Sequence, residues 1–148
     1  MEIDTEAEID LDPVTRLRAL EHLTLLCPSA PSADDWQRLC GLPALCALTM
    51  RATAFATLPA TAVFTEVTEL ALLTDDGRTA QAALHLLPRA FPKLRFVSVT
   101  GRVAPDTDLD ITSPAGLRHL YRVHVGVGTT RVRGADTLPS TVEVHDLD

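Results

Sequence analysis

Three carboxylates at alternate positions, Asp106, Asp108 and Asp110, come closest in this chain to the spacing of a metal site. Carboxylates spaced in this way begin a calcium-binding loop, where their oxygens coordinate the ion. Such a loop also needs a glycine where Ile111 stands and a glutamate where Leu117 stands. The sequence therefore favours an acidic surface loop, and no metal is expected.

Proton transfer is a second chemistry that the sequence suggests, because His124 could meet Glu69 or Glu143 on one face of a sheet. Without a predicted pocket, such a pair is more often a surface ion pair than a catalytic one. His119 lies five residues before His124, which would place the two rings on different faces, and neither has an obvious third ligand.

Nucleophilic catalysis has weaker signals still. Ser98 and Ser140 lack the glycine-flanked elbow that exposes a catalytic serine. The cysteines are odd in number and lack the paired spacing of a zinc site, so they are expected to be small buried residues: Cys27, Cys40 and Cys46. The sequence predicts neither an enzyme nor a cofactor.

Length and composition indicate one globular domain. The chain has 148 residues, of which 46% are apolar and 22% are charged. No apolar run is long enough to cross a bilayer, and the N-terminus is acidic where a secretory signal is basic, so a cytoplasmic protein with no membrane partner is expected. The net charge of −7 argues against nucleic acid as a partner.

Charge is unevenly distributed along the chain. Residues 1–12 contain six acids and no base, whereas residues 89–133 contain eight bases and three acids. The folded protein should therefore be acidic at one end and more basic towards the other.

The elements that must position these residues are predicted by a recurring apolar spacing of three, three and two. It occurs in five rows: Leu17, Leu20, Leu23 and Leu25; Leu42, Leu45, Leu48 and Met50; Phe64, Val67, Leu70 and Leu72; Phe91, Leu94, Val97 and Val99; Leu117, Leu120, Val123 and Val125. A weaker sixth row is Pro139, Val142 and Val144. The alternating β-branched residues at 97–99 and 123–127 indicate that each row ends in a short strand.

Helix signals lie between the rows. A helix is predicted over 34–40, because Ser32 and Asp35 resemble a capping box and Gly41 can end it. Asp76-Gly77 predicts a turn, after which Thr79 would cap a helix over 80–87. Ser113 before a proline predicts a shorter helical segment.

The N-terminal stretch alternates acids with uncharged residues from Glu2 to Asp12. This alternation is typical of a strand, and a strand with one charged face would cap the first row. A solvated acidic tail is the alternative. The predicted organisation is an acidic strand or tail over 1–13 and a repeat domain over 14–148.

The rows resemble leucine-rich repeats. Counted from the first residue of each row, the period is 25, 22, 27 and 26 residues, within the 20 to 29 of that family. The resemblance covers residues 14–145 and implies an α/β solenoid of five to six units, with short parallel strands on a concave face and helices or helical turns on a convex face. The usual asparagine or cysteine after each strand is replaced, so the chain is similar to short, irregular bacterial members: the replacements are Pro28, Thr53, Asp75, Arg102 and Gly128.

Aligning the rows predicts which side chains share the concave face. The first column is His22, Ala47, Glu69, Phe96 and Arg122; the second is Thr24, Thr49, Ala71, Ser98 and His124, continued by Glu143; the third is Leu26, Arg51, Leu73, Thr100 and Gly126. Aromatic residues and arginine predominate at binding hot spots. The predicted partner-binding residues are Phe96, Tyr121, Arg122, Glu69, His124, Arg95, Leu73 and Arg51. Alternatively, Phe96 packs on a neighbouring loop and the arginines are simply solvated.

The sequence therefore predicts a non-catalytic protein–protein interaction domain. Its size and acidity favour an immunity or inhibitor protein that blocks a toxin or enzyme. An adaptor or target-recognition subunit of a larger complex is the alternative within the same class. A hydrolase or transferase with an unrecognised site, or a structural subunit that assembles through its terminal strands, would belong to other classes. The sequence does not determine the oligomeric state.

Overall fold

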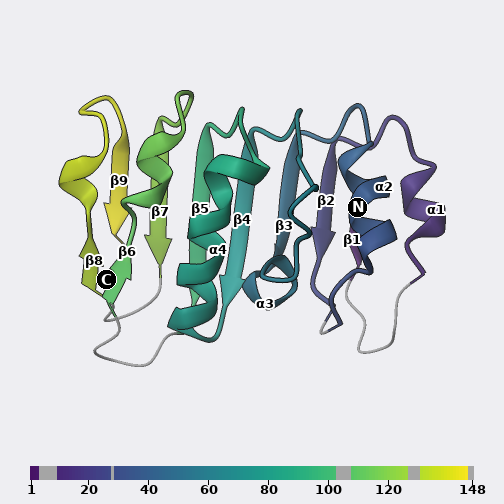
Figure 1. Cartoon of the computed structure of the whole chain (residues 1–148), viewed down its shortest axis with the longest axis horizontal. Helices are drawn as coiled ribbons and strands as arrows, with labels where there is room; N and C mark the ends of the chain where they lie inside the picture. Colours follow the sequence, from purple (N-terminus) through teal and green to yellow (C-terminus); the bar gives the residue numbers. More distant parts are fainter. Residues whose placement is uncertain (4–9, 28, 103–107, 127–130, 147–148) are drawn as a thin grey trace.

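The protein is an α/β structure built on an open parallel sheet. The computed structural model describes residues 1–3, 10–27, 29–102, 108–126 and 131–146. Within these ranges seven strands form the main sheet, all pairs are parallel, and the strands follow one another in chain order (Figure 1). They are β1 (Glu2–Ile3), β2 (His22–Leu25), β3 (Ala47–Arg51), β4 (Glu69–Thr74), β5 (Phe96–Gly101), β7 (Arg122–Gly126) and β9 (Glu143–Asp146). The predicted α/β class and the parallel strands at the ends of the rows are confirmed.

The recurring apolar rows form the core beneath the sheet. All four positions are buried in the rows that begin at Leu42, Phe64, Phe91 and Leu117. The first row is less well covered, because Leu17 is 40% exposed and the side chain of Leu20 is half-buried. A row at the end of a stack has a neighbour on one side only, which accounts for the difference.

Aromatic rings fill the centre of this core. Phe91 stacks on Phe64 with ring centroids 5.0 Å apart and on Phe55 at 5.4 Å. Trp36 meets Phe64 edge-on at 6.2 Å. All four rings are fully buried or nearly so, and such pairs add to the stabilisation that burial alone provides.

Burial alternates along the strands, so the two faces of the sheet differ. In β3, Leu48 and Met50 are buried whereas Ala47, Thr49 and Arg51 are half-buried. The same alternation recurs in β2, β4 and β7. Helices and turns therefore cover one face, and we call the other the open face.

Helices and helical turns connect the strands. Their bounds are α1 (Asp12–Thr15), α2 (Ala33–Cys40), α3 (Ala52–Phe55), α4 (Gly77–Ala90), η1 (Ser113–Gly116) and η2 (Ala135–Thr137). The helix expected over 34–40 is confirmed as α2: Ser32 and Asp35 form a complete capping box, and Gly41 is the C-terminal cap.

The longest helix, α4, starts earlier than the sequence analysis predicts. Asp76 caps it by accepting hydrogen bonds from the backbone N–H groups of Arg78 and Thr79 at 3.2 Å. Thr79 is not the cap; its hydroxyl donates to the Asp76 carboxylate. Asp76 and Gly77, predicted to form a turn, are therefore the N-terminal cap and the first residue of the helix. The helix continues through Pro88 to Ala90.

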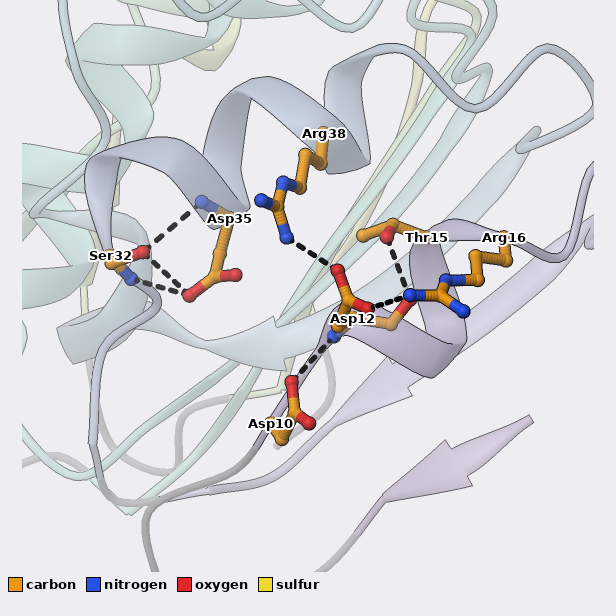
Figure 2. Close-up of polar contacts among 7 residues, drawn as sticks. All are labelled: Asp10, Asp12, Thr15, Arg16, Ser32, Asp35 and Arg38. Atoms are coloured by element: carbon orange, nitrogen blue, oxygen red, sulfur yellow. Dashed lines mark hydrogen bonds and ion pairs between the residues drawn. The ribbon is translucent and has the colours of Figure 1, made fainter.

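The N-terminal stretch is only partly the strand that its alternation predicts. β1 pairs with β2, so the first residues do extend the sheet, whereas residues 4–9 lie outside the described part of the chain. Asp12 begins α1 rather than ending a strand, because Pro13 suits the first turn of a helix. Figure 2 shows Asp12 between two arginines: Arg16 in the same turn, and Arg38 on α2, whose Nη1 lies 2.7 Å from Oδ1 of Asp12. The pair with Arg38 links α1 to α2, whereas the pair with Arg16 lies within the α1 segment.

A small second sheet was not expected. β6 (Asp108–Asp110) and β8 (Arg131–Arg133) pair in parallel, and Arg133 forms an ion pair with Asp108. The predicted acidic surface loop is therefore a strand over its last three residues, with Leu109 buried between the two aspartates. Asp106 lies outside the described residues.

Candidate partner-binding face

The pairing register brings the predicted columns together on the open face. The first column runs through His22, Ala47, Glu69, Phe96 and Arg122, and the second through Thr24, Thr49, Ala71, Ser98 and His124. Both alignments are confirmed, with one correction. Glu143 pairs with Arg122 and ends the first column; His145 occupies the place that Glu143 was expected to fill.

The third column is also confirmed over four strands, from Arg51 through Leu73 and Thr100 to Gly126. Leu26 falls just beyond the end of β2. Its carbonyl accepts a hydrogen bond of 3.1 Å from Nε of Arg51, whose Nη1 also lies 3.5 Å from the carboxylate of Asp75. Arg51 is therefore held across three neighbouring segments instead of standing free in solvent.

Arg122 is fixed on the open face by its neighbour in the same column. Its Nε and Nη2 donate to one carboxylate oxygen of Glu143, at 3.0 and 2.8 Å. Both side chains remain about half exposed, at 43% and 57%. A pair in this setting contributes little to stability, but it orients the guanidinium.

Tyr121 is an exposed aromatic ring at this end of the face. It is 41% exposed and lies just before β7, at the edge of the sheet where the strands start. The guanidinium carbons of Arg95 and Arg122 each lie 5.5 Å from its ring centroid. These two cation–π contacts restrict the motion of the tyrosine ring.

Phe96 differs from the other three phenylalanines, all of which are buried in the core. It is half-buried on the open face beside a shallow hollow of about 70 Å³. Small side chains at Ala47 and Ala71 leave this space, and Glu69 lies at its rim. The sequence analysis identified the column but not the hollow, which depends on the neighbouring residues being small.

His124 is poorly placed for acid–base chemistry. Its Nε2 is shielded from solvent and has no hydrogen-bond partner among the described residues. A Cβ placed on Gly126 would lie 3.6 Å from that nitrogen, so the imidazole packs against the glycine. The predicted pairing with Glu69 or Glu143 is thus not made through Nε2.

The other candidate chemical groups are held in structural roles. Ser98 is buried. All three cysteines are free thiols, but only Cys27 is buried as expected, whereas Cys40 and Cys46 are half-buried. Burial raises the pKa of the Cys40 thiol to about 11, so it stays protonated and unreactive at neutral pH. Over the described ranges, no three His, Cys, Asp or Glu side chains come close enough to hold a metal ion.

One serine–histidine contact was not foreseen. Ser113 does not cap η1 as predicted; its hydroxyl lies 2.6 Å from Nδ1 of His85 on α4. Beside it, the side-chain amide of Gln81 donates to the carbonyl of Asp110 at 2.9 Å and accepts from its N–H at 2.8 Å. These contacts join α4 to β6 and η1, so their evident role is to hold the small sheet in place.

Comparison with known proteins adds no assignment. No protein-family model, curated protein or solved structure matches this chain. Among the described helices, none is long and apolar enough to cross a membrane.

Proposed function

We propose that this chain is a non-catalytic protein-binding domain, built as a short leucine-rich-repeat-like array, that binds its partner through the open face. The repeat interpretation is supported by strands that follow in chain order, and by β2, β3, β4, β5 and β7, each of which contains the last two positions of an apolar row. In such an array the outward side chains of successive strands combine into one surface. The open face then corresponds to the concave face of the family.

One observation carries the proposal: the strand-start end of the open face displays two aromatic rings whose surroundings hold them ready to bind. Phe96 is half-buried beside a hollow, and Tyr121 is flanked by two guanidinium groups. Interfaces depend on rigid aromatic and arginine anchors surrounded by less important contacts. The binding site comprises Phe96, Tyr121, Arg122, Glu69, His124, Arg95, Leu73 and Arg51.

The role that best fits this surface is that of an inhibitor or immunity protein that covers part of a toxin or enzyme. The charge of −7 supports this role, because an acidic protein can occupy a site built for an anion. Added salt should then slow association, since the opposite charges steer the encounter. An adaptor of a larger complex would use the same face but would leave its partner's activity intact.

The direct test is a double substitution, Phe96→Ala with Arg122→Ala, in protein used to capture partners from its native lysate. Once a partner is isolated, the variant should bind it about thirtyfold more weakly, because each hot-spot residue is worth on the order of 1 kcal/mol. The matched control is Leu17→Ala with Arg131→Ala, which removes an exposed apolar side chain and an exposed arginine away from the open face.

An affinity that changes by less than about twofold in the open-face variant, with its circular dichroism unchanged, would reject this binding site. Equal losses in the control variant would reject it as well. Inhibition of the partner's activity separates an inhibitor from an adaptor.

A further inference from the structure

The edge at which the strands start carries a hollow that the predicted columns do not include. Its volume is about 250 Å³, and it is lined by Thr68, Lys93, Arg95 and His119. These residues come from the segments just before β4, β5 and β7. The segments are joined side by side, since the N–H of Arg95 donates to the carbonyl of Thr68 at 2.8 Å and that of Tyr121 to the carbonyl of Arg95 at 2.9 Å.

Positive charge predominates in this hollow. Nζ of Lys93 is paired with the carboxylate of Glu66 at 2.9 Å, so its charge is balanced. Arg95 is exposed, and within the described part of the chain its side chain makes no hydrogen bond or ion pair; its recorded contact is the ring of Tyr121. A guanidinium offers five N–H donors, and here they are left to solvent or to a ligand.

We propose that this hollow receives an acidic side chain of the bound partner protein. The proposal rests on the proposed function, because it assigns one contact of the same interface. The carboxylate would pair with the Arg95 guanidinium, whose planar fork matches both of its oxygens, while Lys93 and His119 border the same space. Tyr121 holds the arginine at the rim, so less freedom is lost when the pair forms.

The charges around the hollow favour a single carboxylate over a nucleic-acid backbone. Glu66 lies beside Lys93, and Glu69 lies on the adjacent strand. A run of phosphates crossing this edge would pass these carboxylates, whereas one acidic side chain could reach Arg95 without meeting them. The net charge of −7 also disfavours binding of a nucleic-acid backbone.

The test uses two synthetic peptides and the full chain labelled with ¹⁵N. One peptide is acetyl-Gly-Glu-Leu-Glu-Gly-amide, and in the other both glutamates are replaced by glutamine. The acidic peptide should shift the amide signals of Thr68, Lys93, Arg95 and His119 with a millimolar dissociation constant, and the neutral peptide should not. Arg95→Gln should weaken binding about threefold, as loss of one exposed ion pair does, whereas Arg131→Gln, another exposed arginine, should leave it unchanged.

Shifts spread evenly over all exposed arginines, equal shifts from both peptides, or no shifts at millimolar peptide would overturn the proposal. Tighter binding of single-stranded DNA at the same four residues would overturn it too. None of these results decides the wider function, which is rejected if the Phe96→Ala, Arg122→Ala variant keeps its partner or if the control variant loses affinity equally. Conversely, peptide binding that depends on Arg95 would survive the loss of the open-face site.

Discussion

Phe91 lies where three stacked rings meet, and its replacement by alanine tests whether the apolar rows hold the molecule together. The ring is fully buried, stacks on Phe64 at an interplanar angle of 8° and on Phe55 at 28°. Truncating a buried phenylalanine costs about 3–5 kcal/mol through lost transfer free energy and the cavity left behind. Two stacked neighbours place this site in the upper half of that range, so we expect a loss of about 4 kcal/mol.

Leu17 provides the matched control, because it occupies the same position in the first row as Phe91 does in the fourth. It is 40% exposed, so alanine removes little buried area there, and the cost should stay below about 1 kcal/mol. Comparing the two substitutions therefore shows whether the loss of unfolding free energy depends on how deeply the side chain is buried, since both residues hold the same place in their rows.

Urea unfolding followed by fluorescence measures both effects, since Trp36 is the single tryptophan and is fully buried. With a slope of about 2 kcal/mol per molar urea, the Phe91→Ala midpoint should fall by about 2 M. Circular dichroism gives an independent signal, because Trp36 touches Phe64 and its emission can change in the native state. If Phe91→Ala does not fold, Phe91→Leu should still lower the midpoint measurably. A fall of less than about 0.5 M, or an equal fall for Leu17→Ala, would refute the reasoning.

Two further substitutions test local geometry. Gly101 has a φ of 144°, and a Cβ there would lie 1.8 Å from the carbonyl oxygen of Thr74, so Gly101→Ala should cost more than about 2 kcal/mol in the same urea assay. Asp76→Ala should lower the thermal midpoint at neutral pH by removing the cap of α4. The pKa of Asp76 is lowered below its usual 3.8, chiefly by the Thr79 hydroxyl and then by the N–H groups of Arg78 and Thr79. The stabilisation that its carboxylate gives is therefore fully present above pH 3.8 and is lost as pH falls through the lowered pKa. The thermal midpoints of wild type and variant should accordingly draw together as the pH is lowered below 3.8 in a series of melts.

Much of the architecture could be predicted because the apolar spacing shows which residues of successive strands are paired. Once Leu48, Leu70 and Val97 are taken as equivalent core positions, the residues between them must share the opposite face. That is why the three columns matched the observed pairing. The sixth row has only three members, and Glu143 was placed one column away from its true partner, Arg122.

What could not be predicted depends on contacts distant in sequence or on competing local signals. Asp76-Gly77 has the composition of a turn. The sequence does not reveal that the Asp76 carboxylate accepts hydrogen bonds from two backbone N–H groups of the helix and so caps it. The pairing of β6 with β8 joins Asp108 to Arg131, and a three-residue strand leaves almost no periodic signal.

The edge hollow was missed for a different reason. The predicted columns counted outward positions within strands, whereas Lys93 and His119 lie in the segments before them. The same alignment of rows could have found them, since each is two residues after the first apolar position of its row, as Lys93 follows Phe91. Only the structure places Arg95 beside both, with its guanidinium held against Tyr121.

The arrangement of core and surface explains why binding can be tested here without unfolding the protein. Every inner row buries its four apolar positions on the covered side, so stability depends on residues such as Leu94 and Val97. Phe96 and Arg122 point to the other side of the same strands, and their contacts there are with neighbours of the open face. Alternation thus places the residues that stabilise the core on one face and the residues of the proposed binding site on the other. Substitutions in the columns should change affinity at nearly constant stability, whereas Leu94→Asp should remove both together by placing a charge in the core.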